Sequence, residues 1–222
     1  MNKTQIKLID AAEREFAEHG FHGASIRDIT SRAGANIAAV NYHFGSKETL
    51  FIEMVRRRVE PINAIRFSRL DKALAESGGA PLEIREIVDI LVRPMVEAYL
   101  QQKQDNDSGN KYFLRAMGRG MAEETQFMSA LHQDILAELI KRFRFELSRS
   151  LADIPSHMIQ LCFAYLGSTL SGVMLRKRRD DNDTSSIEFM DADHLVNFLT
   201  GGLQAVVSEH RNTVPQNSEN AP

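Results

Sequence analysis

The sequence of 222 residues predicts an all-α protein, with a small N-terminal module of three helices and a larger C-terminal helical domain. Apolar residues recur at helical spacing through most of the chain, and no segment alternates apolar and polar residues as a strand does. Glycines, prolines and polar clusters divide the chain into segments of helix length. We expect domains over residues 1–50 and 51–211, and a disordered tail over residues 212–222 that holds almost no apolar residue.

The first predicted helix covers about residues 4–19 and ends at Gly20, because glycine tolerates the left-handed backbone that closes many helices. Its apolar residues share one face: Ile6, Ile9, Ala12, Phe16 and Ala17. We expect this face to form the core on which the next two helices pack.

The stretch from Ser25 to Lys47 predicts two short helices joined by a turn and followed by the start of another helix. Ser25 is suited to cap the first of them, and Asp28 lies three residues later, near the positive helix end. Gly34 provides the turn, and Asn36 is suited to cap the second helix. This layout predicts a helix-turn-helix, in which the second helix enters the DNA major groove.

The second helix of this pair, from about residue 37, has Val40 and Phe44 spaced to face inward. Small residues at its front let the helix approach a groove closely, and Ala39 is suited to contact a thymine methyl group. Polar side chains around it are placed to donate to base edges or phosphates. The residues that we expect to contact DNA are Ser25, Arg27, Asn36, Ile37, Ala38, Ala39, Asn41, Tyr42, His43 and Lys47.

Several residues of this module stand as in the TetR family of bacterial repressors, which residues 4–55 resemble: Phe16, Gly20, Ser25, Ile29, Ala33, Gly34, Tyr42, His43, Phe44 and Lys47. The run AAVNYHFGSK at residues 38–47 is also similar to PsrA-type regulators of fatty-acid metabolism and to CecR-type repressors. The resemblance implies a repressor that binds a pseudo-palindromic operator in double-stranded DNA as a homodimer. It also implies release by a small apolar or amphipathic effector, such as a fatty acid or an acyl-coenzyme A.

The formal net charge of -3 is not that of a generally basic nucleic-acid binder. Local charge is more informative, because basic residues such as Arg27, Arg32 and Lys47 lie near the N-terminal end while acidic residues gather in later loops. A run of three arginines at residues 56–58 follows the module. We interpret this run as a solvated helix face, with a groove contact as the alternative.

Beyond Lys47 the sequence predicts a succession of helices. Pro61 is expected to kink or divide the helix that starts at Lys47. Further helices are expected at about residues 81–102, 112–118, 125–151, 155–178 and 191–210. Pro81 suits the first turn of its helix, which Pro94 then disturbs.

Apolar residues surround nearly the whole circumference of the predicted helix 155–178, so more than one of its faces must be covered. Together with the last helix, it predicts a two-fold interface between subunits, with an ordinary core inside one protomer as the alternative. The interface residues that we expect are Phe163, Leu166, Gly167, Leu170, Leu199 and Leu203.

A second apolar set is expected to line an effector cavity: Phe113, Arg115, Met117, Met121, Phe127, Phe163 and Met174. Methionine and phenylalanine also fill ordinary cores, which is the alternative interpretation of this set. Arg115 is suited to an anionic head group, although an internal salt bridge would use the same charge.

Enzymes and metal proteins form the other functional classes that we considered. His132 near Asp134, and His157 near Asp153, have no nucleophile motif, phosphate loop or metal triad beside them. A small helical enzyme and an interaction module that does not bind DNA are therefore alternatives only, and we expect no cofactor and no metal. Cys162 is the only cysteine, and the chain has neither a bilayer-spanning apolar run nor a secretory signal. We expect a cytoplasmic protein without a membrane partner.

Overall fold

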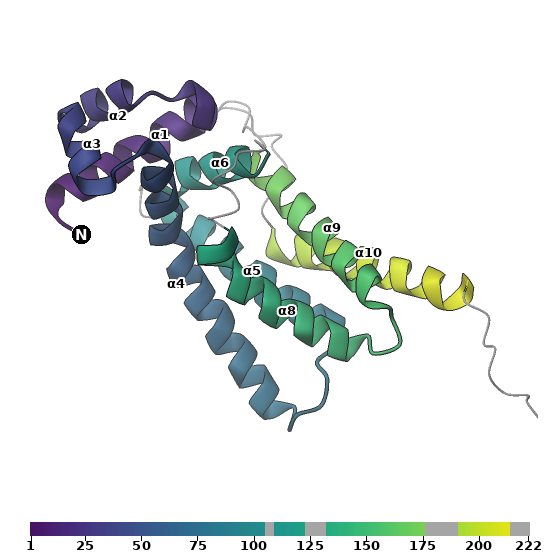
Figure 1. The fold of residues 1–222 in the computed structure, drawn as a ribbon. Coiled ribbons are helices and arrows are strands. Elements are labelled where there is room, and N and C mark those ends of the chain that lie inside the picture. The colour runs from purple at the N-terminus through teal and green to yellow at the C-terminus, as the bar shows by residue number, and fades with distance from the viewer. Residues whose placement is uncertain (105–108, 123–131, 176–190, 214–222) are drawn as a thin grey trace, which may run out of the picture.

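The computed structural model describes residues 1–104, 109–122, 132–175 and 191–213, and all regular structure within them is helical. Figure 1 shows a small head and a larger body, which confirms the predicted all-α class. The head consists of α1 (Lys3–Gly23), α2 (Ile26–Ala33) and α3 (Ile37–Phe44). The next helix, α4 (Lys47–Glu76), begins in the head and runs along the body.

The first helix differs from its prediction at both ends. Gly20 interrupts α1 with φ 74° and ψ 178°, but a further turn follows it to Gly23. Of the predicted core residues, Ile9, Ala12, Phe16 and Ala17 are fully buried. The expectation for Ile6 was wrong, because Leu8 takes the buried position in this first turn and Ile6 is 40% exposed.

The fourth helix is continuous over 30 residues, so the predicted division at Pro61 is wrong. Proline removes the N–H that would bond the carbonyl of Arg57, but the Pro61 ring lies on the exposed side, where water can reach the helix. The predicted domain boundary at residue 50 also falls inside α4. Head and body are therefore connected by a helix and not by a linker.

The body contains helices whose bounds differ modestly from the predicted ones: α5 (Ile84–Gln104), α6 (Gly109–Ala122), the π-helical turn η1 (His132–Leu136), α8 (Ala137–Ser150), α9 (Ser156–Leu175) and α10 (Ala192–Thr213). Pro81 precedes α5 and is not part of its first turn, because the first intrahelical bond runs from Ile87 N to the Glu83 carbonyl (3.1 Å). The predicted helix 125–151 is described only from residue 132, and the end of the predicted helix 155–178 lies outside the described residues. The last helix reaches Thr213, two residues into the predicted tail, whose remainder is not described.

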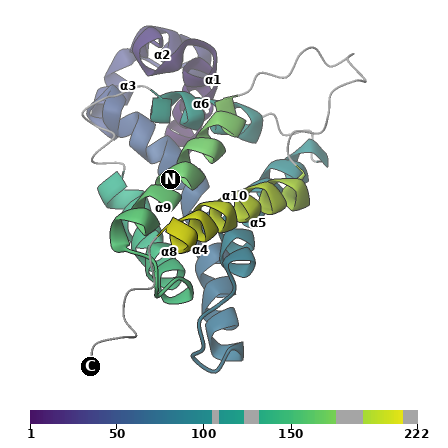
Figure 2. The ribbon, with the colours of Figure 1, turned by 90° about the vertical axis from the view of Figure 1, so that its right-hand side faces the viewer.

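Helices of the body pack in two pairs, with α10 along α5 and α9 along α6 (Figure 2). Among the described helices, the most extensive contact joins α6 to α1 in the head. Gly120 allows α6 to approach closely, because a Cβ atom there would lie 2.5 Å from Cζ of Phe51. Arg119 Nη1 donates to the carbonyls of Ala17 (3.1 Å) and Glu18 (2.7 Å). The head is therefore attached to the body through α6 as well as through α4.

Candidate nucleic-acid interface

Local capping defines the second helix of the head. Ser25 Oγ accepts from the backbone N–H of Asp28 (3.1 Å) and donates to the Asp28 carboxylate. The predicted cap is therefore present, although the carboxylate bonds the hydroxyl and not the backbone N–H of Ser25. Gly34 ends α2 with φ 62°, and Ala35 N donates to the carbonyl of Thr30 (2.9 Å). This glycine turn sets the direction of α3.

Helix α3 has one face buried against the head and the opposite face exposed. Val40 and Phe44 are buried as predicted, and Asn36 Oδ1 accepts from Ala39 N (2.9 Å). Because the cap uses Oδ1 of Asn36, the Nδ2 group is the part of this side chain left for a base edge. Ala39 is half-buried. The exposed face of α3 consists of Ile37, Ala38, Asn41 and Tyr42, and Tyr42 is 85% exposed.

The exit from α3 holds polar groups that follow the exposed face. The rings of Tyr42 and the half-buried His43 meet edge to face, with centroids 4.9 Å apart. Ser46 Oγ caps α4 by accepting from Thr49 N (3.1 Å). Hydrogen bonds from its own backbone N–H and then from the Ser46 hydroxyl lower the pKa of Glu48. The exposed Tyr42 precedes the N-terminus of α4 by five residues in the chain, and helix N-termini favour phosphate oxygens.

Lys47 has a different place from the one predicted. Its Nζ atom donates to the carbonyls of Phe21 (2.8 Å) and Ala24 (3.0 Å) and lies 4.5 Å from the centroid of the Phe21 ring. An ammonium group has three donors, so these carbonyls occupy most of its capacity. The interpretation of Lys47 as a free phosphate ligand is corrected, because the side chain fastens α4 to the end of α1.

The two arginines of the second helix differ in whether carboxylates hold them. Arg32 pairs with Glu15 (2.7 Å) and with Glu18 (3.1 Å). Arg27 is exposed and forms no ion pair with any residue that the structure describes. Of the cations predicted to contact DNA, Arg27 is the one whose charge remains available at the surface.

The arginine run at residues 56–58 connects α4 to its surroundings. Arg57 pairs with Asp10 (2.9 Å), and Arg58 forms two hydrogen bonds with Glu13 (2.8 and 2.9 Å). Arg56 pairs with acidic residues of its own helix. The interpretation as a solvated face is wrong for Arg58, whose side chain is only 15% exposed because it packs on the acidic side of α1.

The predicted effector residues are brought together only in part. Phe113 and Met117 are buried on α6, whereas Arg115 and Phe163 are half-buried. The side chains of Met121, Phe127 and Met174 lie outside the described residues.

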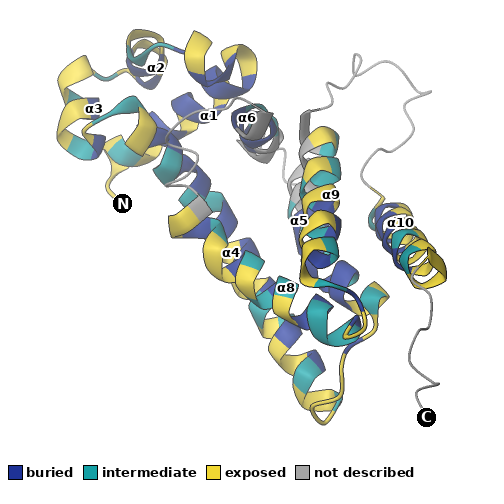
Figure 3. Cartoon of the chain, turned by 45° about the vertical axis from the view of Figure 1, so that its right-hand side comes forward, coloured by how far each residue is buried: buried dark blue, intermediate teal, exposed yellow. Residues whose placement is uncertain are grey.

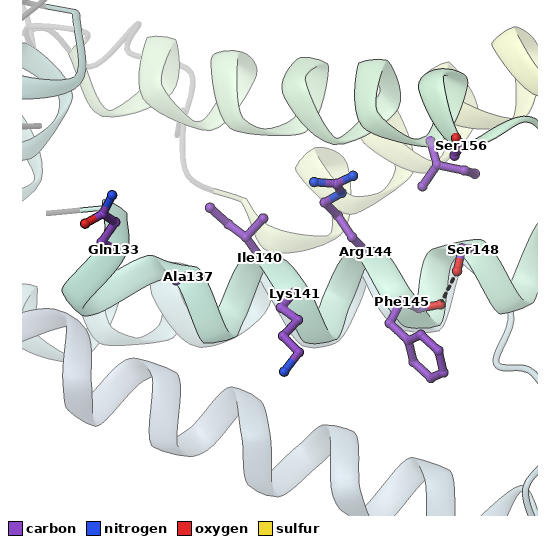
Figure 4. A pocket seen from close by; sticks show the side chains of 9 residues that line it. Gln133, Ala137, Ile140, Lys141, Arg144, Phe145, Ser148 and Ser156 are labelled. Atoms are coloured by element: carbon purple, nitrogen blue, oxygen red, sulfur yellow. Dashed lines mark hydrogen bonds between the residues drawn. The ribbon is translucent and has the colours of Figure 1, made fainter. Parts of the chain in front are cut away.

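A surface groove of about 630 Å³ lies elsewhere, along α8 beside the start of α9 (Figure 4). In it Ile140 and Arg144 point toward α9, while Phe145 points away from it. None of the predicted effector residues lines this groove.

The predicted subunit interface also needs correction. Leu166, Leu199 and Leu203 are at most 5% exposed, because they pack inside the protomer. Phe163, Gly167 and Leu170 are half-buried. Among the side chains that the structure describes, the large apolar ones exposed on α9 and α10 are instead Leu161, Tyr165 and Phe198. Figure 3 shows exposed positions along both helices. Helical periodicity identified the correct two helices but not which face of each is left open by its neighbours.

Comparison with known families decides the class of this protein. The model of bacterial regulatory proteins of the tetR family matches residues 8–54, which hold the head and the start of α4. The model of the tetracyclin repressor-like C-terminal domain matches residues 93–202 of the body. The chain belongs to the TetR family. As a TetR-family protein it is a transcriptional regulator, and the alternative of a small helical enzyme is excluded.

Individual relatives match this TetR-family chain over stretches of different length. The repressor AcnR of Corynebacterium glutamicum is 40% identical over 50 residues, which make up 22% of this chain and 27% of that relative. The dual regulator CecR of Shigella flexneri is 50% identical over 46 residues, or 21% of this chain and 20% of its own. The match to AcnR of Corynebacterium diphtheriae is longer, with 25% identity over 82% of this chain and 84% of that relative.

Solved structures show the same fold at low identity. The fatty acid degradation regulator FadR of Bacillus halodurans superposes with a TM-score of 0.59 and 18% identity, over 92% of this chain and 98% of that one. None of the helices that the structure describes combines the length and apolar character of a membrane-crossing segment.

Proposed function

We propose that this TetR-family regulator is a repressor that binds a pseudo-palindromic operator as a homodimer and is released by a small apolar or amphipathic effector. The exposed front of α3 is the observation that carries the proposal. Ile37, Ala38 and Asn41 stand clear of the protein on a helix whose back is locked by Val40 and Phe44. A rigid helix with a small-residue front fits the major groove.

The composition of this face indicates how it would read DNA. The helix α3 contains neither lysine nor arginine, so sequence recognition would depend on alanine methyl groups beside thymine and on the Asn41 amide at a base edge. Arg27 and Tyr42 would fix the register on phosphates. We expect specificity from few direct contacts, with a salt dependence smaller than that of a strongly basic reader.

Two heads are needed for an operator with two half-sites. The exposed Leu161, Tyr165 and Phe198 offer an apolar surface on α9 and α10. Small exposed residues beside them would allow close approach of a second copy: Ala164, Ser168, Gly201, Gly202 and Ala205. A self-complementary patch of this kind supports a two-fold dimer.

The effector is proposed to be a fatty acid or an acyl-coenzyme A. The similarity of residues 38–47 to PsrA-type regulators supports this choice, and the solved FadR of similar fold is described as a regulator of fatty acid degradation. Buried apolar side chains such as Phe113 and Met117 are compatible with an acyl chain.

Selection of bound sequences from random duplex DNA tests the proposal. The full chain should enrich an inverted repeat, and an acyl ligand added to the complex should reduce retention of the enriched DNA. A matched variant, Ala38→Glu, places a charge at the front of α3 and should enrich nothing. If the unaltered chain enriches no palindrome, the operator-binding proposal is wrong. Enrichment without any effect of acyl ligands would reject the effector alone.

A further inference from the structure

The body buries one positive charge without a counter-ion. Arg66 lies in the middle of α4 and is 7% exposed. Its Nε atom donates to the carbonyl of Leu91 (2.7 Å) and its Nη1 atom to Oδ1 of Asn63 (2.9 Å). Burial lowers the pKa of Arg66 to about 10, so the guanidinium still carries its charge at neutral pH.

Other arginines near Arg66 are paired. On the same helix, Arg58 binds the buried Glu13 and Arg69 binds Glu97 at 2.7 Å. On α5, Arg93 binds Asp89 at 2.6 Å. Within the described residues no carboxylate lies within ion-pair distance of Arg66, and no acceptor bonds its Nη2 atom. An uncompensated buried charge is costly, which is why buried arginines are normally paired.

Arg66 contacts α5 directly and η1 through Asn63. Leu91 lies three residues before Pro94, where the missing N–H weakens the hydrogen bonding of α5. Asn63, which Arg66 contacts, donates from Nδ2 to the carbonyl of Ile135 (3.3 Å) in the π-helical turn η1. Single π-helical turns are frequent at functional sites. The elements that Arg66 reaches are therefore a helix with an internal proline and a π-helical turn.

We propose that Arg66 is the cationic end of a ligand site and binds the carboxylate of an effector whose remainder is apolar. This inference rests on the proposed function and specifies the chemistry of its effector. A carboxylate would supply the missing counter-ion and accept from the open Nη2 atom in a charge-assisted hydrogen bond. The surrounding helices bury apolar side chains that suit the remainder of such a molecule, including Ile62, Leu70, Val88, Met95 and Ile135. The residue expected from sequence to meet an anion, Arg115, is half-buried and is replaced in this role by Arg66.

The position of Arg66 also connects binding to the head. Arg66 does not line the groove along α8. It also does not line a second groove of about 530 Å³, which lies between the start of α5 and the end of α10. Because Arg66 is only 7% exposed, we expect a ligand that reaches its guanidinium to change the packing of α4, α5 and η1. Differential affinity for two conformations is what allows an effector to shift a conformational equilibrium. Because α4 begins in the head at Lys47, that shift would alter the placement of α3.

Calorimetric titration with matched probes tests the site. The probes are decanoate against 1-decanol and benzoate against benzyl alcohol, added to the full chain. We expect at least one carboxylate to bind about 10- to 100-fold more tightly than its alcohol, the range for a hydrogen bond to a charged group. If neither carboxylate exceeds its alcohol by about 10-fold, the proposal is wrong, whatever the variants show.

Three variants assign the preference to Arg66. Arg66→Met should abolish the carboxylate preference while the affinity for the alcohol changes less than about 3-fold, and Arg66→Lys should retain part of the preference. Arg69→Met, one turn along α4, should behave as the unaltered chain. Carboxylate preference that survives in Arg66→Met would overturn the assignment. If Arg66→Met fails to fold, as judged by circular dichroism, an undiminished preference in Arg66→Lys would overturn the assignment of the carboxylate to Nη2, an atom that lysine lacks. The operator selection is a separate measurement, so failure to bind DNA would reject the proposed function and leave the calorimetric result standing.

Discussion

Lys47 shows how one side chain can stabilise the head from inside. Its ammonium group donates to two carbonyls near the end of α1, and its first helical position on α4 brings the two helices together. Both acceptors are backbone groups, so the contact fixes the path of the chain between α1 and α2. A positive charge that follows α3 in the chain is therefore used to stabilise the fold.

Replacing Lys47 distinguishes a role in the stability of the head from a role in phosphate contact. Lys47→Met should lower the free energy of unfolding by about 1.5–3 kcal/mol, because it leaves two carbonyls without a charged donor, and urea denaturation would measure this loss. The slope of log affinity for DNA against log salt should stay unchanged. Arg27→Ala is the matched variant, for which we expect stability within about 0.5 kcal/mol and a slope reduced by about 0.9. The reverse pattern would place Lys47 on a phosphate.

Glu13 gives the head a dependence on pH. Burial raises the pKa of Glu13 above its ordinary value of 4.5, although the hydrogen bond from Arg58 opposes this shift. The folded state then binds the proton more tightly than the unfolded chain, so the contribution of Glu13 is most favourable below pH 4.5 and is lost as pH rises through the folded pKa. Relative to Glu13→Gln, the unaltered chain should lose unfolding free energy as pH rises above 4.5. Glu60→Gln, at an exposed position, should show no such trend, and a rise with pH for Glu13 would mean that pairing with Arg58 outweighs burial.

Capping residues of the head could be predicted because their interactions are local. Ser25, Gly34 and Asn36 act within three residues of themselves, so their spacing contains the necessary information. Lys47 and Arg66 also bond backbone carbonyls that are distant in sequence, and a carbonyl leaves no signature of residue type. The sequence could therefore identify a charged residue near a predicted interface. It could not show whether that residue bonds other groups of the same protein.

At the scale of elements, α6 is the part of the body that is packed most closely against the head. Gly120 faces Phe51, whose ring also meets Phe16 edge to face at 5.1 Å between centroids. Arg119 adds two hydrogen bonds to α1. Movement of α6 would therefore be transmitted directly to the helix that supports α2 and α3.

A larger side chain at the contact between Gly120 and Phe51 should reduce stability measurably. Gly120→Ala would place a Cβ atom 2.5 Å from Cζ of Phe51 and should lower the free energy of unfolding by about 1–3 kcal/mol. The double variant Gly120→Ala with Phe51→Leu removes the clashing ring atom, so its loss should be smaller than the sum of the two single losses. Additive losses in urea denaturation would show that α6 does not approach Phe51 this closely.

Sequence periodicity located α9 and α10 but not the faces that remain open on them. Leu166, Leu199 and Leu203 match a buried stripe whether the covering helix belongs to the same protomer or to another. The structure removes this ambiguity for those leucines, because their own protomer already covers them. Pro61 was misjudged for a related reason: tertiary packing and an exposed ring allow α4 to continue through it.

At the scale of the whole molecule, the exposed apolar patch predicts the mode of assembly. Phe198→Arg places a charge within the patch on α10, and sedimentation should show a monomer with operator affinity reduced at least about 100-fold, the loss expected when one of two linked heads is removed. Phe145→Arg alters a comparably exposed phenylalanine on α8, where Phe198 is 69% and Phe145 60% exposed, and should leave the dimer intact. If instead Phe145→Arg dissociates the dimer and Phe198→Arg does not, the two copies meet through α8.

The central claim is that two α3 helices on a two-fold axis read one operator. Fluorescence anisotropy with the enriched inverted repeat, compared with the same repeat carrying about five additional base pairs between its half-sites, tests it most directly. Half a helical turn would rotate one half-site to the opposite face of the duplex, so we predict a loss of affinity of at least about 100-fold. Equal affinity for the two duplexes would show that the heads bind independently and would contradict the claim.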